Sequence, residues 1–288
     1  MGTLAEMLST PLGVIEWFVY LLAAVMFVIG LHLMNSPKTA RKGNMVSAIG
    51  MVFAVAMAFI VLFAGEASNG FKHGVAVIVL IVGIVIGAVA GVGSAKKVKM
   101  TDMPQLVSVF NTVGGGAAAL VALNDILTSA ETPSIVVLIT AGLGIMIGSV
   151  TFSGSLIAAG KLQGIKWVKK LSLPGKGFWN ILFVVLTIVS FVMLCVQPNQ
   201  RLLWSILTTV FALCYGLVFV IPIGGADMPV VISVLNACTG TAVAMSGLAI
   251  NNIALIVAGA LVGAAGVTLS IAMSKAMNRP LLSVLAGG

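Results

Sequence analysis

Charged residues are scarce in this 288-residue chain. Asp, Glu, Lys and Arg make up 8% of it and apolar residues 60%, against roughly 25% charged in an ordinary soluble domain. The mean hydropathy is +1.21. Apolar runs of about 20 residues, long enough to cross a ~30 Å hydrocarbon layer, recur along the whole chain. Because backbone polar groups in lipid must be satisfied within the segment, we expect an all-α fold, a polytopic transmembrane helical bundle.

Cysteine and histidine are also scarce, with three and two residues. Cys195, Cys214 and Cys238 fall inside apolar runs, with no CxxC and no Cys/His ligand spacing, so we expect small inert side chains and no metal site. The sequence also lacks a GxxxxGK[ST] loop and an HExxH motif. We therefore expect this chain to bind no metal and no nucleotide cofactor by itself.

The apolar runs predict one transmembrane domain over residues 1–288 with about nine spans. The first run is too long for a signal-peptide core and has Glu6 ahead of it and Glu16 near its start, so we expect a retained helix. The predicted spans are 13–34, 45–65, 74–94, 103–125, 134–159, 178–196, 202–223, 229–249 and 252–274.

The net charge of +8 is distributed by side of the membrane, which argues against a nucleic-acid partner. If the connection 36–44 is cytoplasmic, thirteen of the fifteen basic residues lie inside, and only Lys72 and Arg201 lie outside. The positive-inside rule then places the N-terminus outside and the C-terminus in the cytoplasm. The inside residues are Lys38, Arg41, Lys42, Lys96, Lys97, Lys99, Lys161, Lys166, Lys169, Lys170, Lys176, Lys275 and Arg279. The acids expected at or near the outer face are Glu6, Glu16, Glu66, Asp125 and Glu131.

The chain contains one helix pair twice. The segment 102–119 (DMPQLVSVFNTVGGGAAA) returns 125 residues later as DMPVVISVLNACTGTAVA, and 144–155 (GIMIGSVTFSGS) returns 115 residues later as GALVGAAGVTLS. The repeat units are about 99–160 and 224–276. Four spans separate the copies, so the internal repeat is predicted to be parallel.

Small and polar residues recur on one stripe of each duplicated helix, at spacings of i, i+4, i+7 and i+11. Such residues are the ordinary means by which membrane helices pack. Asn111 and Asn236 lie about 12 Å past the inner ends of their spans, where an amide needs a partner. Two explanations remain open: an amide bond between helices, or a hydrated polar path for an ion or proton.

Other features of the stripes suggest structural roles. Asp102 and Asp227 each precede Met-Pro, where an acid caps the start of a helix and faces its positive dipole end. In span three, Gly83, Gly87 and Gly91 form a small-xxx-small ladder that favours close approach of a neighbouring helix. The two histidines, His32 and His73, lie outside the membrane centre, so this chain has no mid-membrane titratable imidazole.

Several long motifs resemble the membrane domain of the β subunit of proton-translocating nicotinamide nucleotide transhydrogenase, from about residue 20 to the C-terminus. These motifs are SPKTARKGN (36–44), KKVKMTDMPQLVSVFN (96–111), VTFSGS (150–155), GGADMPVVISVLN (224–236), GALVGAAG (259–266) and SKAMNR (274–279).

The resemblance implies an enzyme that couples hydride transfer between NAD(H) and NADP(H) to proton movement across the bacterial inner membrane. It implies soluble NAD(H)- and NADP(H)-binding domains outside this chain, α-subunit membrane helices as partners, a dimer of α/β protomers, and contact with lipid. The chain stops at LLSVLAGG, where the family leads into its NADP(H)-binding domain. We therefore expect that domain, and any catalytic residue for hydride transfer, to be absent from this chain.

The resemblance also assigns residues. It implies that Asn236 and Ser155 lie in the proton channel, that Asp227 lies at its inner mouth, that Gly266 is sensitive to replacement, and that Arg279 leads to the NADP(H) domain. The best-known relatives carry the relay histidine where this chain has Asn111, and some carry it on an α-subunit helix instead. We predict a proton pathway through Asn236, Ser155, Asn111, Thr151 and Ser233, and inner-face coupling through Asp227, Asp102, Gly266, Lys275 and Arg279.

Two other functions fit the residues. A stand-alone ion channel or secondary carrier would surround a solute with the duplicated stripes and would transport it without soluble domains. A purely structural membrane anchor would use the stripes for packing alone.

Overall fold

The computed structural model describes residues 10–64, 70–129, 132–166, 168, 171 and 175–285. Within those residues the chain folds into helices only, nine of them long and apolar enough to span a membrane. The spans are α2 (Pro11–Met34), α3 (Ala40–Ala64), α4 (Gly70–Lys97), α5 (Met103–Thr128), α6 (Ile135–Leu162), α8 (Lys176–Val196), α9 (Arg201–Val220), α10 (Met228–Ala249) and α11 (Ile253–Ala276). Short turns of 3-10 helix, η1 (Met100–Asp102), η2 (Pro198–Gln200) and η3 (Gly225–Asp227), precede α5, α9 and α10, and α12 (Leu281–Leu285) follows α11.

The predicted all-α bundle of nine spans is therefore confirmed, with differences only at the helix ends. Glu6, Glu66, Glu131, Lys169 and Lys170 lie outside the described residues. So do the side chains of Lys72, His73 and Lys176.

Local sequence explains where several spans begin. Ser134 accepts a hydrogen bond from the Val137 amide ahead of α6, and Asn252 accepts one from the Leu255 amide ahead of α11. Both are N-caps that satisfy a free amide of the first turn. The α5 and α10 helices instead begin with proline in the first turn, where its fixed φ suits the helix and no amide donor is lost.

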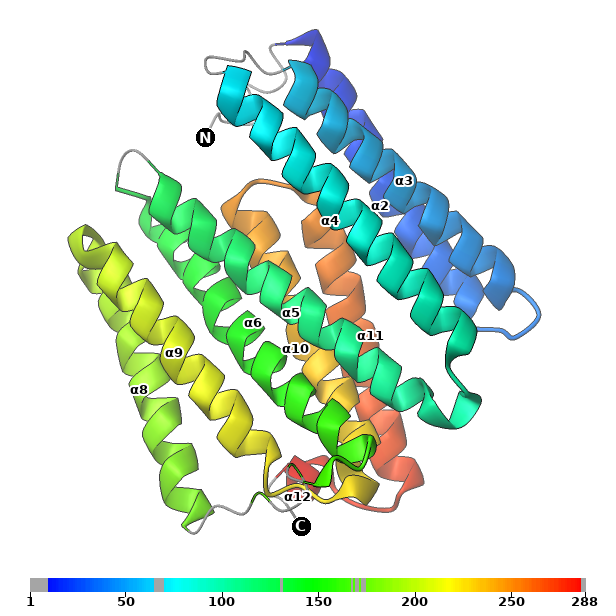
Figure 1. Cartoon of the computed structure of the whole chain (residues 1–288), viewed down its shortest axis with the longest axis vertical. Helices are drawn as coiled ribbons and strands as arrows, with labels where there is room; N and C mark the ends of the chain where they lie inside the picture. The colour runs from blue at the N-terminus through cyan, green and yellow to red at the C-terminus, as the bar shows by residue number, and fades with distance from the viewer. Residues whose placement is uncertain are drawn as a thin grey trace.

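The duplicated pairs form the centre of the molecule. The α5 helix packs on α6 and α10 packs on α11, and the two pairs join because α10 also contacts α6 and α5. Figure 1 shows these four helices running side by side, with α10 and α11 behind α5 and α6 in that view. The α10 helix is the most deeply buried span. The predicted parallel repeat is thus the core of the bundle.

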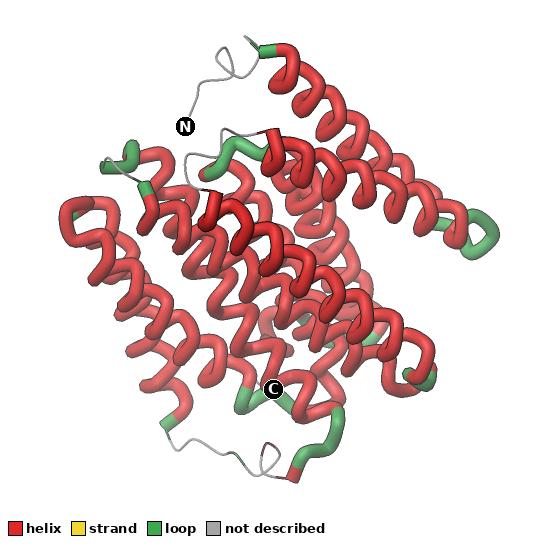
Figure 2. Tube along the Cα trace, turned by 45° about the horizontal axis from the view of Figure 1, so that its top comes forward, coloured by secondary structure: helices red, strands yellow, loops and turns green. Residues whose placement is uncertain are grey.

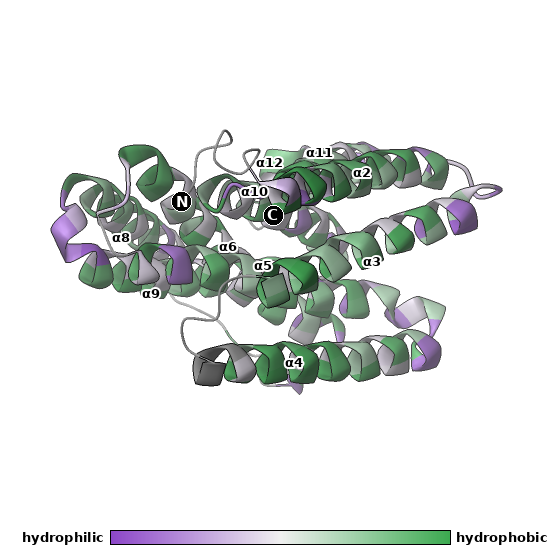
Figure 3. Ribbon diagram, turned by 90° about the horizontal axis from the view of Figure 1, so that it is seen from above, coloured by the Kyte–Doolittle hydropathy of each residue, from purple (hydrophilic) through white to green (hydrophobic). Residues whose placement is uncertain are grey.

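Two helix hairpins flank this centre. The α8–α9 pair packs on α6 mainly through α9, and the α2–α3 pair meets α11 through α2. Figure 2 shows the helices as long rods with their connections gathered at the two ends. In Figure 3 most of each rod is hydrophobic, and the hydrophilic residues concentrate near the ends, as expected for helices that cross lipid.

The α4 helix stands apart from the rest. Figure 3 shows it as a separate row, and no described side chain of α4 is buried. A Cβ added at Gly83, Gly87 or Gly91 would meet nothing within 4 Å. The prediction that this ladder packs against a neighbouring helix is therefore wrong for the described chain, because no other described helix approaches that face.

Candidate functional site

The two duplicated asparagines line one cavity. It has a volume of about 350 Å³, lies between α5, α10 and α11, and is open to the surface of the bundle where Val107, Phe110 and Val262 are exposed. Asn111 reaches it from α5 and is 5% exposed, whereas Asn236 reaches it from α10 and is half-buried. The remaining lining residues are small or apolar apart from one threonine, and they are Val107, Phe110, Gly114, Thr239, Gly240, Val243, Ala258, Gly259 and Val262.

Of the two polar ends of the Asn111 amide, only the nitrogen has a hydrogen-bond partner among the described residues. Its Nδ2 donates to the Ser155 hydroxyl at 2.8 Å, and Ser108 donates to the Ser155 carbonyl at 2.8 Å, so α5 and α6 are bonded at this level. The Asn111 Oδ1 is buried without a hydrogen-bond partner in the described structure. The hydrogen bond between helices, one of the two explanations for Asn111, is thus made by the amide nitrogen but not by the amide oxygen. A buried acceptor without a partner costs about 1–3 kcal/mol, so its oxygen favours a water or an incoming donor.

Asn236 differs from its counterpart. In the first repeat, the amide of Asn111 bonds to Ser155, but the equivalent Ser270 donates to the Gly266 carbonyl at 2.7 Å. Among the described residues Asn236 has no side-chain hydrogen bond, and it faces the cavity. The repeat therefore duplicates the residues but not their contacts.

Thr239 is a cavity residue that the sequence-based prediction missed. It is 7% exposed, and its hydroxyl is buried with no partner in the described part of the chain. Its counterpart in the first repeat is Gly114, so a search for polar residues present in both repeats does not find it. The available signal was its position three residues after Asn236, which places both on one helix face.

Thr151 and Ser233 do not reach the cavity. The Thr151 hydroxyl donates to the Gly148 carbonyl of its own helix at 3.0 Å. The Ser233 hydroxyl donates to the Gly266 carbonyl of α11 at 3.1 Å. Both side chains are buried and act in helix contacts here.

Glycine allows the helices around the cavity to touch through their backbones. A Cβ on Gly240 would lie 2.3 Å from the Gly263 nitrogen, and a Cβ on Gly266 would lie 2.7 Å from the Ala237 nitrogen. A Cβ on Gly115 would lie 2.3 Å from the Thr151 hydroxyl. Any larger residue at Gly266 would push α11 away from α10 at Ala237, the residue that follows Asn236.

At one end of α10, Asp227 forms an ion pair with Arg279. The Arg279 guanidinium lies 2.6 and 2.7 Å from the two carboxylate oxygens. The Asp227 side chain is 7% exposed and that of Arg279 is 38% exposed. This pair therefore joins the start of α10 to the segment that follows α11, and one partner remains open to solvent.

Asp102 and Asp227 occupy the N-cap positions as expected, but the side-chain capping hydrogen bond predicted for each is absent. Neither carboxylate accepts a hydrogen bond from the first turn of its helix. Asp227 pairs with Arg279 instead, whereas Asp102 is exposed and only accepts a 3.4 Å hydrogen bond from Thr101. Lys275 is also exposed. The two aspartates are equivalent in the repeat but have different partners, because a basic residue follows only the second helix pair at the required position.

The described residues contain no group of three or more His, Cys, Asp or Glu side chains that could hold a metal ion. The polar groups around the cavity are amides and hydroxyls, which donate and accept hydrogen bonds but do not titrate near neutral pH. The arrangement can thus hold water in an otherwise apolar space and pass hydrogen bonds along it.

Comparisons with known proteins point to one family. The family described as NAD(P) transhydrogenase beta subunit matches residues 16–288. The NAD(P) transhydrogenase subunit beta of Rhodospirillum rubrum is 38% identical over 276 residues, which cover 93% of this chain and 57% of the relative. A protein of the same name from a defined strain of that species gives the same values. The chain thus spans a little over half the length of these relatives.

Proposed function

The chain belongs to the NAD(P) transhydrogenase beta subunit family, and from that premise we propose that it forms the proton-translocating membrane part of a transhydrogenase. In this proposal, proton movement through the bundle is coupled to hydride transfer between NAD(H) and NADP(H). The hydride transfer takes place on soluble domains outside this chain. The observation that supports the proposal most is the cavity shared by Asn111, Asn236 and Thr239, where two buried oxygens have no hydrogen-bond partner among the residues that the structure describes.

The cavity residues would act by ordering water. The Asn111 Oδ1 accepts a hydrogen bond, the Thr239 hydroxyl donates or accepts one, and the Asn236 amide does both. Water held by these groups would give a proton a hydrogen-bonded route through a space that is otherwise apolar. Ser155 would fix the Asn111 amide so that its oxygen stays directed away from α6.

The titratable group of the relay would come from a partner. This chain has Asn111 where the best-known relatives have histidine, and an amide cannot carry the proton itself. A histidine on an α-subunit membrane helix next to the cavity would supply that step. The exposed α4 helix is consistent with further helices in the assembled enzyme, which we propose to be a dimer of α/β protomers.

Coupling would act at the inner face. The Asp227–Arg279 pair holds the start of α10 to the segment after α11, which in the family leads toward the NADP(H)-binding domain. A change in that domain that draws Arg279 away would release the start of α10, eight residues before Asn236. Lys275 and Asp102 would support this region without contacting the proton, and Gly266 would keep α11 close to α10 next to Asn236.

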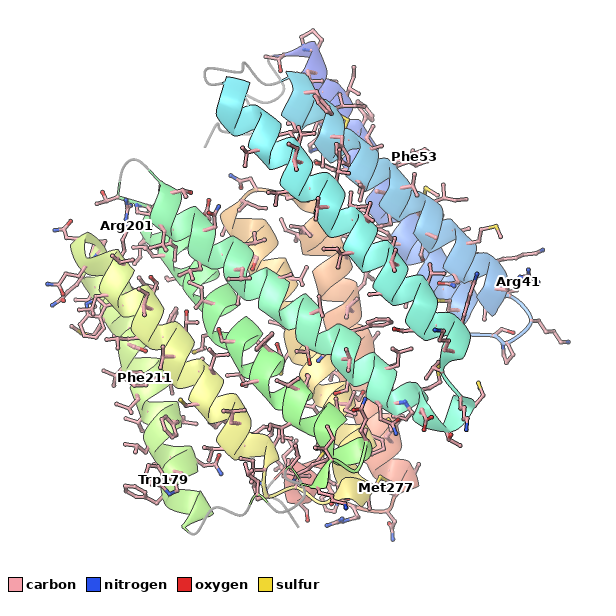
Figure 4. All side chains as sticks on the ribbon, viewed as in Figure 1. Arg41, Phe53, Trp179, Arg201, Phe211 and Met277 are labelled. Carbon is pink, nitrogen blue, oxygen red and sulfur yellow. The ribbon has the colours of Figure 1, made fainter. Side chains whose placement is uncertain are left out.

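The chain is a multi-pass membrane protein, and we propose that it lies in the bacterial inner membrane with its N-terminus outside. Figure 4 supports this orientation, because Arg41 and Met277 lie toward one edge of the bundle and Arg201 toward the opposite edge. Lys38, Arg41 and Lys42 all lie in or next to the α2–α3 connection at the first edge, where the positive-inside rule places the cytoplasm.

The test is the variant Asn236→Leu in the assembled enzyme. An apolar side chain of similar size removes the hydrogen-bonding amide without emptying the cavity. The rate of proton pumping should therefore fall at least tenfold, which corresponds to a free-energy barrier higher by about 1.4 kcal/mol or more. Pumping is measured in vesicles with a pH-sensitive dye. Asn124→Leu is the matched control, because Asn124 lies on α5 outside the cavity lining. Equal pumping by Asn236→Leu and the control would exclude the proposed route. In a separate experiment, proton flux through this chain alone in liposomes would favour the stand-alone channel.

A further inference from the structure

Lys161 makes an unusual set of contacts at the last turn of α6. Its ammonium donates hydrogen bonds to the backbone carbonyls of Val220, Ile221 and Ile223, at 3.3 Å for the first and 2.8 Å for the last. The side chain is half-buried, and no carboxylate of the described chain forms an ion pair with it. All three donors of the ammonium are thus directed at backbone oxygens.

These carbonyls belong to the end of α9 and to the connection that leads to η3. The last carbonyls of a helix have no partner inside the helix, and a cation placed there is favoured by the helix dipole. Lys161 supplies that partner from another helix. It therefore attaches the beginning of the α9–α10 connection to α6, the helix that also carries Ser155 and its bond to Asn111.

The other end of the same connection is held by Arg279 through Asp227. Between the two attachment points lie Gly224 and Gly225, and a Cβ added at either would meet nothing within 4 Å. Packing does not restrain this pair, and glycine has the widest range of backbone conformations. The connection is thus fixed at both ends by basic side chains, whereas its middle is held only by backbone hydrogen bonds of the η3 turn, from Asp227 to Gly224 and from Met228 to Gly225.

We propose that Lys161 is a positioning residue that keeps the α9 side of this connection in place while the Asp227 side moves. When Arg279 releases Asp227, the connection bends at Gly224 and Gly225, and η3 and α10 shift relative to α6. Asn236, on α10, then moves relative to Asn111, which is bonded to α6. This inference rests on the proposed function, because it explains how release at the inner face reaches the cavity.

Without Lys161 the same release would spread into α9. Residues 220–223 would then move together with η3, so α10 would not shift relative to α6. Hydride transfer between the nucleotides would proceed without moving Asn236 relative to Asn111. If Lys161 only capped α9, its replacement would have a different effect. Hydride transfer and proton pumping would then be lost equally, because the protein would be less stable.

The experiment compares Lys161→Met and Lys161→Arg in the assembled enzyme, with Lys97→Met as the control. Lys97 ends α4, is exposed, and makes no ion pair in the described chain. Hydride transfer between nucleotides and proton pumping are measured on the same vesicles. Lys161→Met should keep hydride transfer close to that of the parent and lower the protons moved per hydride about fivefold, a typical size for coupling between two sites. Lys161→Arg and Lys97→Met should keep the parent ratio.

Hydrogen exchange supplies a second measurement. In Lys161→Met the backbone amides of residues 220–224 should exchange faster, while those around Asn111 stay protected. An unchanged proton-to-hydride ratio, or a parallel loss of both activities, would overturn the proposal. Asn236→Leu is assayed alongside: if that variant still pumps, the proposed function fails, whatever Lys161→Met does.

The glycines provide a variant that does not depend on the stability of Lys161→Met. Gly225→Ala meets no atom within 4 Å and restricts the bend, so pumping should slow about two- to fivefold without a loss of thermal stability. Parent pumping in Gly224→Ala and Gly225→Ala would contradict a bend at this place.

Discussion

Hydrogen bonding separates the polar residues of the duplicated helices into two groups. Ser108, Ser155 and Ser233 have their hydrogen bonds to the neighbouring helix of their pair, so they act in packing. Asn111 and Thr239 each retain a buried oxygen that has no hydrogen-bond partner within the described ranges. Because such groups are costly unless something else bonds to them, we assign them to water in the cavity.

The two groups should respond differently to loss of a hydroxyl. Ser155→Ala leaves the Asn111 Nδ2 buried without a partner, which should lower the free energy of unfolding by about 1–3 kcal/mol. Thr239→Val keeps the shape and removes a hydroxyl that has no partner in the described part of the chain, so the change should stay within about 0.5 kcal/mol. Thermal unfolding of the purified chain in detergent measures both. In the assembled enzyme we expect both variants to pump fewer protons. Equal destabilisation by Thr239→Val would mean that its hydroxyl stabilises the fold.

At the level of whole helices, small residues have two different roles. Around the cavity, glycines bring α10 and α11 into backbone contact, and the space left by their missing side chains is filled by the other helix. Along α4, the spacing of the glycines is similar, but no described helix fills that space. The small-xxx-small pattern therefore indicates that a close approach is possible, and the partner decides whether it occurs.

Alanine substitutions test this contrast. Gly240→Ala places a Cβ 2.3 Å from the Gly263 nitrogen, so α10 and α11 must separate, and we expect a loss of about 1–3 kcal/mol from overpacking. Gly87→Ala in α4 meets nothing within 4 Å and should leave the melting temperature of the chain unchanged. Both are measured by thermal unfolding of the same preparation. A similar melting temperature for the two variants would contradict the contacts described for Gly240.

Across the whole molecule, the charges and the odd number of spans agree on orientation. The nine spans found in the described residues would place the beginning and the end of the bundle on opposite sides of the membrane. The lysines and arginines then gather on the side that carries Asp227 and Arg279. The Asp227–Arg279 ion pair at the start of α10 and the Lys161 contacts therefore lie on the predicted cytoplasmic side, where a soluble nucleotide-binding domain would reach them.

Cysteine labelling tests this orientation. In a background with the three native cysteines replaced by alanine, Asn199→Cys, between α8 and α9, should react with an impermeant maleimide added to intact cells. Lys97→Cys, at the end of α4, should react only after the membrane is opened, because the positive-inside rule places it in the cytoplasm. The reverse labelling pattern would invert the orientation and place the Asp227–Arg279 pair outside.

The sequence by itself determined the class of fold, the spans and the repeat, because apolar length and residue spacing are local properties of the chain. It also indicated Asn111 and Asn236 as unusual, since two amides within apolar helices stand out in any arrangement. It pointed to the family through long motifs that need no coordinates.

Only the tertiary structure decided what each of these residues contacts. Asp227 pairs with Arg279 although Asp102 has the same local sequence, Asn111 bonds to Ser155 although Asn236 has no such bond, and Thr239 enters the cavity where its counterpart is glycine. The motifs that the two repeats share, Asp-Met-Pro and the asparagine nine residues after the Asp, do not distinguish these outcomes. A buried polar group takes its partner from helices distant in sequence, and the rotation and spacing of those helices depend on how all of them pack together.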